Sequence, residues 1–469
     1  MPFIGAHCKN LTTLECKFND NSFIDNADDF VQAFTQLDKL KCIKITMNHN
    51  YLNKTINLSA IIDSLPEKIN EIHLFSEPWW EVKRNISMCV QRFRNLQKLT
   101  SVGLCLDNII LNEIADITTL VYLNIEIYDT YENLSLFNKL VNLEYINLTM
   151  GISKYKPQIL STEVLNTIFS TCKNLKHLDM TSGSYDIADI PLRKWINFQN
   201  LQHLGISCDI MPDLANTIVK YCKNLKHLRI PNYYGNDTYA FKKLTELENL
   251  ECLILDGPID LHEDSIIAIS NNCKKLQRLE IPSCTIKPAI DDVPLSSPSV
   301  LDELSKLQYL EHLNLRDAKN LADSTIIAIA NNCKNLKSLD ITACTDLTEA
   351  ALVALTNLKN LQKLNVECLD IVTDSFLIKL KGIKELYCDD CQNFTDAGII
   401  QFIKNNPDLE KISVRYINNI TVDIVIAADQ ATKNRTNGII LHIIMDSFFI
   451  FEAKPIIKSQ WFKKSFLVP

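Results

Sequence analysis

Residues 333–355 read CKNLKSLDITACTDLTEAALVAL, and this stretch decides the fold class. Its first nine letters fit the frame L-x-x-L-x-L, in which the leucines of a short strand turn to one face. Copies of this frame begin at Cys172, Cys222 and Cys273, where the chain reads CKNLKHLDM, CKNLKHLRI and CKKLQRLEI. Self-similarity of this kind predicts a repeat architecture in place of a single compact core.

Sixteen leucines or equivalent residues open such a frame, and the spacing between them distinguishes the repeat class. The spacings run from 22 to 34 residues and mostly lie near 25. That period is typical of leucine-rich repeats, whereas helical repeats and propeller blades have longer periods. The sixteen positions are 11, 40, 69, 96, 120, 143, 175, 201, 225, 250, 276, 310, 336, 361, 383 and 409.

The segment between two strands has the periodicity of a helix. In STIIAIANNC, Ile326, Ile329, Ala330 and Cys333 fall at i, i+3, i+4 and i+7, which makes one apolar stripe. We expect a short acidic residue to start each helix by accepting the free amides of its first turn. The candidates are Asp323, Glu349, Asp374 and Asp396.

A strand, a crossover helix and the next parallel strand form a right-handed connection. The sequence therefore predicts an α/β leucine-rich-repeat solenoid, a right-handed superhelix with a parallel concave sheet and outer helices. We expect about sixteen repeats over residues 1–443. Residues 444–469 break the period and form a non-repeat tail, which is either a cap on the last repeat or a contact site.

Composition argues against several classes of function. Only 10 of the 469 residues are glycine, which disfavours phosphate-cradling loops, and the net charge of −8 with no basic block disfavours nucleic acid as a partner. The chain opens without a secretory signal, and its longest apolar stretch, 439–451, is too short to span a membrane. We therefore expect a cytoplasmic or nuclear protein without membrane contact, and we expect its 16 cysteines not to form a disulfide framework.

The strand, cysteine and turn that end at Cys284, Cys344 and Cys391 resemble the cysteine-containing class of leucine-rich repeat. That class is best known from F-box proteins, the substrate receptors of Skp–cullin–F-box ubiquitin ligases. The resemblance covers nearly the whole chain and is sharpest from about residue 160 to 415. It departs from the F-box pattern at the N-terminus, because the first repeat begins at Cys8 and leaves no room for the adaptor-binding module.

The strand frame predicts a column of side chains on the concave face. Three histidines fall at the same strand position of consecutive repeats, so they could contact a partner, bind a metal or have no special role. Of these we favour partner contact over a metal. The candidate residues on this face are Tyr122, Tyr145, His177, His203, His227, Arg229, Arg278, His312 and Arg316.

A second set of candidates lies in the loops that leave the strand ends. Aromatic residues on one rim of a solenoid are typical anchors of protein interfaces, although they could instead fold over the repeat ends and cap the core. These residues are Trp79, Trp80, Tyr155, Tyr233 and Tyr234. Cys388 and Cys391 form a C-x-x-C pair, but the repeat frame predicts that both are buried as small hydrophobic residues.

The sequence shows no catalytic triad, phosphate loop or metal ligands at zinc spacing, so we expect neither an enzyme nor a cofactor. The resemblance implies a protein-binding solenoid, similar to the substrate-recognition part of an F-box subunit. Its partners would then be a protein target and, through a missing or indirect F-box, a Skp-type adaptor and a cullin. The alternative is a stand-alone scaffold or inhibitor with no link to ubiquitin.

Overall fold

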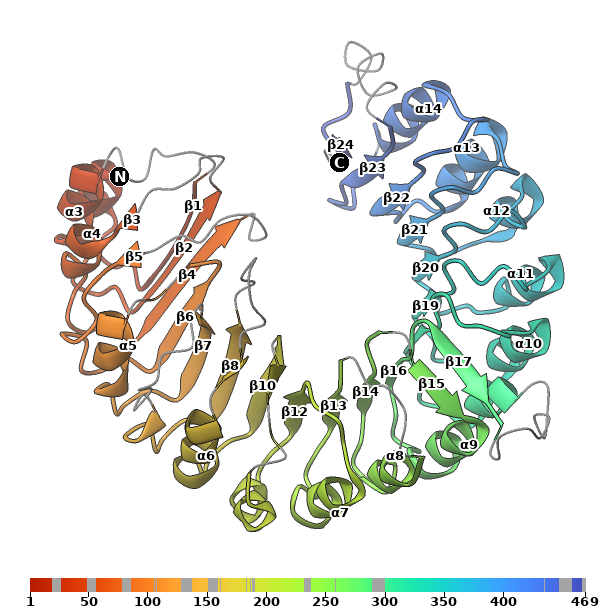
Figure 1. Cartoon of the computed structure of the whole chain (residues 1–469). Helices are drawn as coiled ribbons and strands as arrows, with labels where there is room; N and C mark the ends of the chain where they lie inside the picture. Colours follow the sequence, from red (N-terminus) through yellow and green to blue (C-terminus); the bar gives the residue numbers. More distant parts are fainter. Residues whose placement is uncertain are drawn as a thin grey trace. The chain divides into compact units, whose positions relative to one another are not determined.

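Figure 1 shows a computed structural model of the chain. It divides into two compact units: unit 1 comprises Met1–Asp209 and Asp213–Pro231, and unit 2 comprises Ile210–Pro212 and Asn232–Pro469. The structure describes residues 1–18, 27–48, 56–77, 86–104, 106, 108–127, 137–150, 159–160, 162–182, 184–185, 187, 190–231, 238–257, 259–288, 300–433, 435–446 and 458–465.

Unit 1 contains a run of parallel strands in which each strand pairs with the next repeat's strand. They are β1 (Thr13–Phe18), β2 (Cys42–Asn48), β4 (Glu71–Glu77), β6 (Lys98–Val102), β7 (Tyr122–Ile127), β8 (Tyr145–Met150), β10 (His177–Ser182), β12 (His203–Ile206) and β13 (His227–Arg229). Two short pairs accompany them, β3 (Ile56–Asn57) with β5 (Ile86–Ser87) and β9 (Ile159–Leu160) with β11 (Ser184–Tyr185). The helical segments are α1 (Pro2–His7), α3 (Ala27–Phe34), α4 (Ser59–Asp63), α5 (Asn108–Ala115), α6 (Thr162–Thr171), η2 (Leu192–Phe198) and α7 (Pro212–Tyr221).

Unit 2 repeats the arrangement with shorter strands. They are β14 (Cys252–Ile254), β16 (Arg278–Glu280), β18 (His312–Asn314), β19 (Ser338–Asp340), β20 (Lys363–Asn365), β21 (Glu385–Tyr387), β22 (Lys411–Ser413), β23 (Leu441–Ile444) and β24 (Phe462–Ser465). A side pair joins β15 (Ile259–His262) to β17 (Cys284–Lys287). The helical segments are α8 (Thr238–Leu244), α9 (Glu263–Asn272), η3 (Val300–Lys306), α10 (Asp323–Asn332), α11 (Glu349–Leu355), α12 (Asp374–Lys379), α13 (Asp396–Asn405) and α14 (Asp423–Thr432).

The predicted repeat frame is confirmed, and the fold is an α/β leucine-rich-repeat solenoid. Each of the sixteen leucine positions is followed two residues later by the first residue of a parallel strand, as Leu336 is by Ser338 of β19. Two further strands of the main ladder, β23 and β24, fall outside that count. The boundary at residue 443 between solenoid and tail remains a prediction, and described strands lie on both sides of it.

Alternation along each strand separates two faces of the sheet. In β19 the central Leu339 is buried, whereas Ser338 and Asp340 on either side of it are partly exposed. The leucines turn toward the helices, which lie along one side of the strands in each unit (Figure 1). We call the opposite side, which carries the partly exposed residues, the open face of a unit.

Buried polar atoms connect one repeat to the next beneath the helices. The Sγ of Cys333 lies 3.5 Å from the carbonyl oxygen of Leu307 in the preceding repeat, and Cys172 and Cys273 make the same kind of contact. In the later repeat Asn406 occupies this place and donates from Nδ2 to the carbonyl of Leu380 at 3.1 Å. The thiols are weak donors that add a contact between neighbouring repeats, and the carbonyls of Leu307 and Leu140 also accept a backbone hydrogen bond within their own repeat.

The expected role of the acidic residues at the helix starts is wrong in its details. Asp323 lies in the first turn of α10, but its carboxylate accepts hydrogen bonds from the backbone N–H and hydroxyl of Thr348 in the next repeat. Thr348 in turn caps α11 by accepting from Ala350 N at 3.3 Å. The carboxylate of Asp323 therefore links two repeats, and a threonine caps the helix in α11 and α13, whereas α10 has Ala322 at this place and no side-chain cap.

The expected burial of the C-x-x-C pair is confirmed. Cys388 and Cys391 are completely buried and are free thiols. The Sγ of Cys391 donates to the carbonyl of Val366 at 3.1 Å, so the C-x-x-C pair belongs to the packing of the repeat. Within the described residues, no helix combines the length and the hydrophobicity that a membrane crossing requires.

Candidate functional site

The open face of unit 1 carries a continuous line of aromatic rings, as the strand frame predicts. Tyr122 pairs with Tyr145, Tyr145 with His177, His177 with His203 and His203 with His227 in the register of five neighbouring strands. All five side chains are neither fully buried nor fully exposed. We call these five residues the aromatic column.

The rings of the aromatic column stack on one another. The ring centroids of Tyr122 and Tyr145 lie 4.0 Å apart at an interplanar angle of 15°. Tyr145 and His177 lie 3.9 Å apart at 9°, and His177 and His203 lie 3.9 Å apart at 13°. The last step, from His203 to His227, is longer at 5.9 Å and tilted by 32°. Neighbouring parallel strands set this spacing, so the backbone ladder holds the rings in a fixed order.

One carboxylate anchors the histidines of the column. Asp179 Oδ2 lies 3.3 Å from His203 Nε2, while its Oδ1 accepts from the backbone N–H and the hydroxyl of Thr181 at 3.0 and 2.8 Å. Gly205 makes room for this carboxylate, because a β-carbon at that position would lie 2.8 Å from Asp179 Cγ. A glycine is thus required next to the carboxylate by close approach.

Burial and hydrogen bonding shift the pKa values of His177 and Asp179. Burial lowers the pKa of His177 to about 3, and the neighbouring His203 adds to this shift, so the ring is neutral at pH 7. Burial alone would raise the pKa of Asp179, but the hydrogen bonds from His203 and Thr181 lower it to about 2. The column therefore presents a neutral imidazole beside an ionised carboxylate.

Three predicted residues lie in unit 2. Arg278 and His312 are register partners on its open face, and Arg316 is exposed in the turn that follows β18. Burial lowers the pKa of His312, and the charge of Arg278 adds to the shift. A shallow hollow of about 190 Å³ is lined by Arg278, Glu280, His312, Leu313, Asn314, Ser338, Leu339, Asp340, Lys363 and Asn365.

Charged side chains on this open face pair with one another. The Lys363 ammonium lies 3.2 Å from the Glu385 carboxylate and 5.2 Å from the ring centroid of Tyr387. Lys411 approaches the same ring to 4.9 Å from the other side, and the Tyr387 hydroxyl donates to Glu385 at 2.9 Å. Tyr387 was not among the residues predicted from the sequence, although the register places it in line with Asp340 and Asn365.

The remaining predicted residues can be placed only in part. Arg229 ends β13 and pairs in register with Gly205 on the open face of unit 1. The rim-loop aromatics lie outside the described residues, and their role as partner contacts remains a prediction. They are Trp79, Trp80, Tyr155, Tyr233 and Tyr234.

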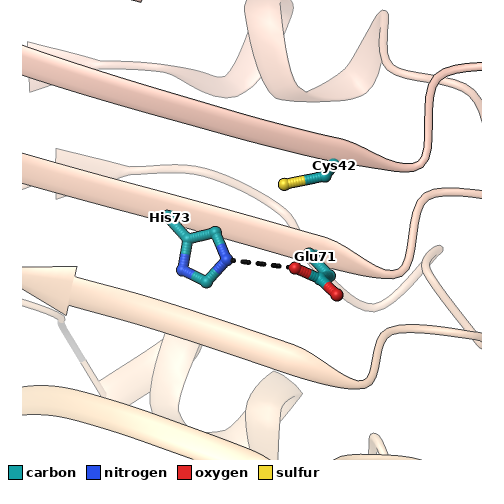
Figure 2. A group of neighbouring side chains, drawn as sticks. All are labelled: Cys42, Glu71 and His73. Atoms are coloured by element: carbon teal, nitrogen blue, oxygen red, sulfur yellow. Dashed lines mark ion pairs between the residues drawn. The ribbon is translucent and has the colours of Figure 1, made fainter. Parts of the chain in front are cut away.

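Two clusters in the described part of the chain could hold a metal ion, and both lie on the open face of unit 1. One comprises His177, Asp179 and His203 in the aromatic column, and the other comprises Cys42, Glu71 and His73 on β2 and β4 (Figure 2). In each cluster the potential ligand atoms lie within 4.8 Å of one another. The second cluster was missed by the sequence analysis because its members come from two repeats whose exposed residues share no pattern.

The chain matches no known protein-family model. Among solved structures it is similar to an internalin from Listeria monocytogenes, with 17% identity over 71% of this chain and 78% of that chain and a TM-score of 0.36. It is similar to the complex of Rad7 and Elc1 in yeast, with 18% identity over 75% and 82% and a TM-score of 0.43. The plant peptide hormone receptor RGFR1 in complex with RGF2 gives 16% identity over 98% and 68% and a TM-score of 0.41. These similarities are remote, and the fold stands on the repeat and the strand register described above.

Proposed function

We propose that this chain is a protein-binding solenoid that holds its target on the open face of unit 1. The observation that carries the proposal is the aromatic column, Tyr122 to His227, with three successive stacking distances of 4.0, 3.9 and 3.9 Å. Stacked rings lose little conformational entropy when a partner binds, because their neighbours already restrict them. Tyrosine in particular offers a large apolar surface together with a hydroxyl, which suits protein interfaces.

Two oppositely charged side chains accompany the aromatic column. Asp179 supplies a negative charge, and Arg229 lies one register step beyond Gly205. A target segment would lie against the edges of the stacked rings and pair with either charge. Arg278, His312 and Arg316 of unit 2 and the five rim-loop aromatics are further proposed contacts.

The finer proposal is that the chain resembles the substrate-recognition part of an F-box subunit of a Skp–cullin–F-box ubiquitin ligase. It rests on the cysteine-type repeat, whose turn cysteines Cys284, Cys344 and Cys391 are each at most 2% exposed. The alternative is a scaffold or inhibitor that binds its target without a link to ubiquitin.

Affinity purification of the tagged chain from its own cells, with proteasome inhibitor present, tests both levels of the proposal. The informative variant is the double substitution Tyr145→Gln and His177→Gln, which removes two rings and leaves the pair of Asp179 with His203 in place. The matched control is Tyr239→Ala, because Tyr239 is an exposed aromatic residue on α8 in unit 2. Circular dichroism on each purified chain checks that it is folded.

We expect wild type and the Tyr239→Ala chain to recover the same protein target and the double variant to lose it. An adaptor and a cullin recovered along with the target would support the ligase receptor, and a target without them would support the scaffold. Equal recovery of the target by the folded double variant would contradict the proposed face.

A further inference from the structure

The second ligand cluster lies at the other end of the open face of unit 1. Cys42 of β2 and Glu71 of β4 are register partners on neighbouring parallel strands, and His73 follows Glu71 by two residues. Residues at i and i+2 of a strand point to the same face, so all three side chains project together. Figure 2 shows them on one side of the two strands, with the imidazole facing the carboxylate. Their thiol, carboxylate and imidazole atoms lie within 4.8 Å of one another.

A buried hydroxyl orients the imidazole. His73 Nδ1 lies 2.8 Å from Oγ1 of Thr100, a residue that is only 2% exposed, and His73 Nε2 lies 3.5 Å from Glu71 Oε2. If Nδ1–H donates to the threonine, the lone pair of Nε2 faces the carboxylate, and a cation between the two would bind both. With the other tautomer, Nε2–H donates directly to Glu71. The first arrangement is the one that metal-binding histidines use, with the second nitrogen held by a neighbouring polar group.

The cluster suits a cation that takes the place of the proton on the Cys42 thiol, because thiol, carboxylate and imidazole lie together. A divalent ion bound here would release that proton, because the thiolate is the ligand.

We propose that Cys42, Glu71 and His73 bind one Zn²⁺ ion and leave its fourth position open to solvent. Sulfur, nitrogen and oxygen ligands together are characteristic of zinc, and three protein ligands plus water make an open site. Zinc–ligand distances of about 2.0–2.3 Å require the three atoms to approach one another to roughly 3.5 Å. Rotation about side-chain bonds supplies that movement, since Glu71 is 27% and His73 19% exposed.

Lys98 is the competitor for this site. Its Nζ lies 3.0 Å from Glu71 Oε1, and the hydrogen bond and charge of Lys98 lower the pKa of Glu71 against the effect of burial. A zinc ion would have to displace this ammonium from one carboxylate oxygen. Because Lys98 is 43% exposed, its side chain can move into solvent.

The cluster of His177, Asp179 and His203 is the weaker candidate. Its two imidazole rings are nearly parallel at 13°, so their in-plane lone pairs do not converge on one point. Asp179 already accepts hydrogen bonds from Thr181 and His203. This cluster also lacks a thiol. With cobalt bound, only the Cys42 cluster would therefore show a thiolate charge-transfer absorption.

The test is a titration of the metal-free full chain with Co²⁺ and then Zn²⁺ under a non-thiol reductant. A thiolate ligand gives cobalt an intense charge-transfer absorption in the near ultraviolet, and Zn²⁺ should abolish this band at one equivalent. We expect Cys42→Ser to lose the band and His73→Gln to weaken zinc binding at least tenfold. Cys252→Ser is the matched control and should behave as wild type, because Cys252 holds the same strand position in β14 but has Arg278 as its register partner.

Lys98→Met removes the competing ammonium and should tighten zinc binding. If Lys98 and Glu71 only form an ion pair and Glu71 does not bind the metal, zinc binding should not tighten. Unchanged or weaker binding in this variant would show that Glu71 is not a ligand and would overturn the three-ligand site. No cobalt band in wild type, or a band that persists in folded Cys42→Ser, would overturn the proposal. Loss of binding in His177→Gln with retention in His73→Gln would assign the metal to the aromatic column and overturn it as well.

Discussion

The two units build their open faces from the same repeat frame but with strands of different length. The first seven strands of unit 1 in the main ladder extend over five to seven residues, from β1 to β10. The first seven of unit 2, from β14 to β22, have three residues each. Longer strands add a further position to the open face, which is buried at Thr46 of β2 and Glu126 of β7, and shorter strands bring the turn closer to the leucines. The residues that follow the last leucine of the frame therefore determine the surface that a repeat presents.

Left-handed turns end the strands of unit 2. Six residues with φ between 53° and 60° occur at equivalent places three residues after a strand, and none of them is glycine. In the first five of these turns the backbone N–H donates to a carbonyl of the next turn, as Ala343 does to Glu367 at 2.9 Å, and in the sixth the N–H of Tyr416 donates to the carboxylate of Asp446. This second ladder compensates for the strain of each turn. The six residues are Ser283, Asp317, Ala343, Cys368, Asp390 and Tyr416.

The chemistry of the faces differs as much as their geometry. Unit 1 places stacked rings in its central strands, which leaves apolar surface available to a partner. Unit 2 places oppositely charged residues side by side, such as Lys363 and Glu385, which satisfy one another. Exposed ion pairs of this kind contribute little to the free energy of folding. Their main effect is on specificity, because they disfavour partners that cannot pair with these charges.

The largest effect is expected where a turn of unit 2 depends on a buried charge. Asp389 is 5% exposed and accepts hydrogen bonds from Ser413 Oγ, Arg415 N and Arg415 Nε at 2.7, 2.8 and 2.7 Å. Asp389→Ala should lower the free energy of unfolding by about 3 kcal/mol, because it leaves a partly buried guanidinium and an amide without partners. Urea unfolding and hydrogen exchange of β21 and β22 measure this effect.

The matched control is Asp260→Ala, which removes an exposed carboxylate 3.7 Å from Lys287 in the same unit. It should change stability by less than about 0.5 kcal/mol. A loss for Asp389→Ala no larger than that of the control would show that the cost of burying the charge cancels its hydrogen bonds.

The next largest loss of stability is expected at Asn406. It tests whether Asn406 and Cys333 make equivalent contacts with the carbonyl of the preceding repeat. Asn406 Oδ1 accepts from Ile383 N at 3.0 Å, and its Nδ2 donates to the carbonyls of Leu380 and Phe402. Asn406→Leu should cost about 2 kcal/mol, because it leaves a buried amide and a carbonyl unpaired. Asn406→Cys should cost about half as much, since a thiol at this place in Cys333 reaches the corresponding carbonyl. Equal losses for the two variants, measured by urea unfolding, would contradict the equivalence.

The sequence predicted the parts of this molecule that follow from repetition. Every leucine position marked a strand, and the column from Tyr122 to His227 followed from counting two residues past each leucine. Strand length did not follow, because a glycine, Gly257, marks the turn after β14 but none marks the six later turns, where residues as different as Ala343 and Tyr416 have a positive φ. The Cys42 cluster did not follow either, since it depends on which exposed residues happen to face one another across two repeats. Partner contacts at the column and the rims remain predictions.

A smaller effect on stability is expected from the pH dependence of His177 in unit 1, compared with His312 in unit 2. Because the pKa of His177 is about 3 in the folded chain and near 6.5 when unfolded, the unfolded chain binds more protons between these values. Stability should therefore fall as the pH drops from 6.5 toward 3. His177→Phe keeps a ring in the stack and should reduce the loss between pH 7 and 4.5 by about 1 kcal/mol, after allowance for solvent screening. Urea midpoints across this range measure it, and His312→Phe in unit 2 should give a smaller change. Parallel pH profiles for wild type and His177→Phe would contradict the assignment.

The smallest effect concerns the strain in a single turn of unit 2. Ala343 has a φ of 58°, a conformation that costs an L-residue about 1 kcal/mol or more and that glycine adopts freely. Ala343→Gly keeps the backbone hydrogen bond to Glu367, but it also loosens the unfolded chain, so we expect a net gain of about 0.5 kcal/mol. The same substitution at Ala328 in α10 should instead cost about 1 kcal/mol, because that position is helical. Thermal or urea unfolding of the two variants should thus give shifts of opposite sign. Destabilisation by both would mean that the second ladder, and not the residue at the turn, already removes the strain.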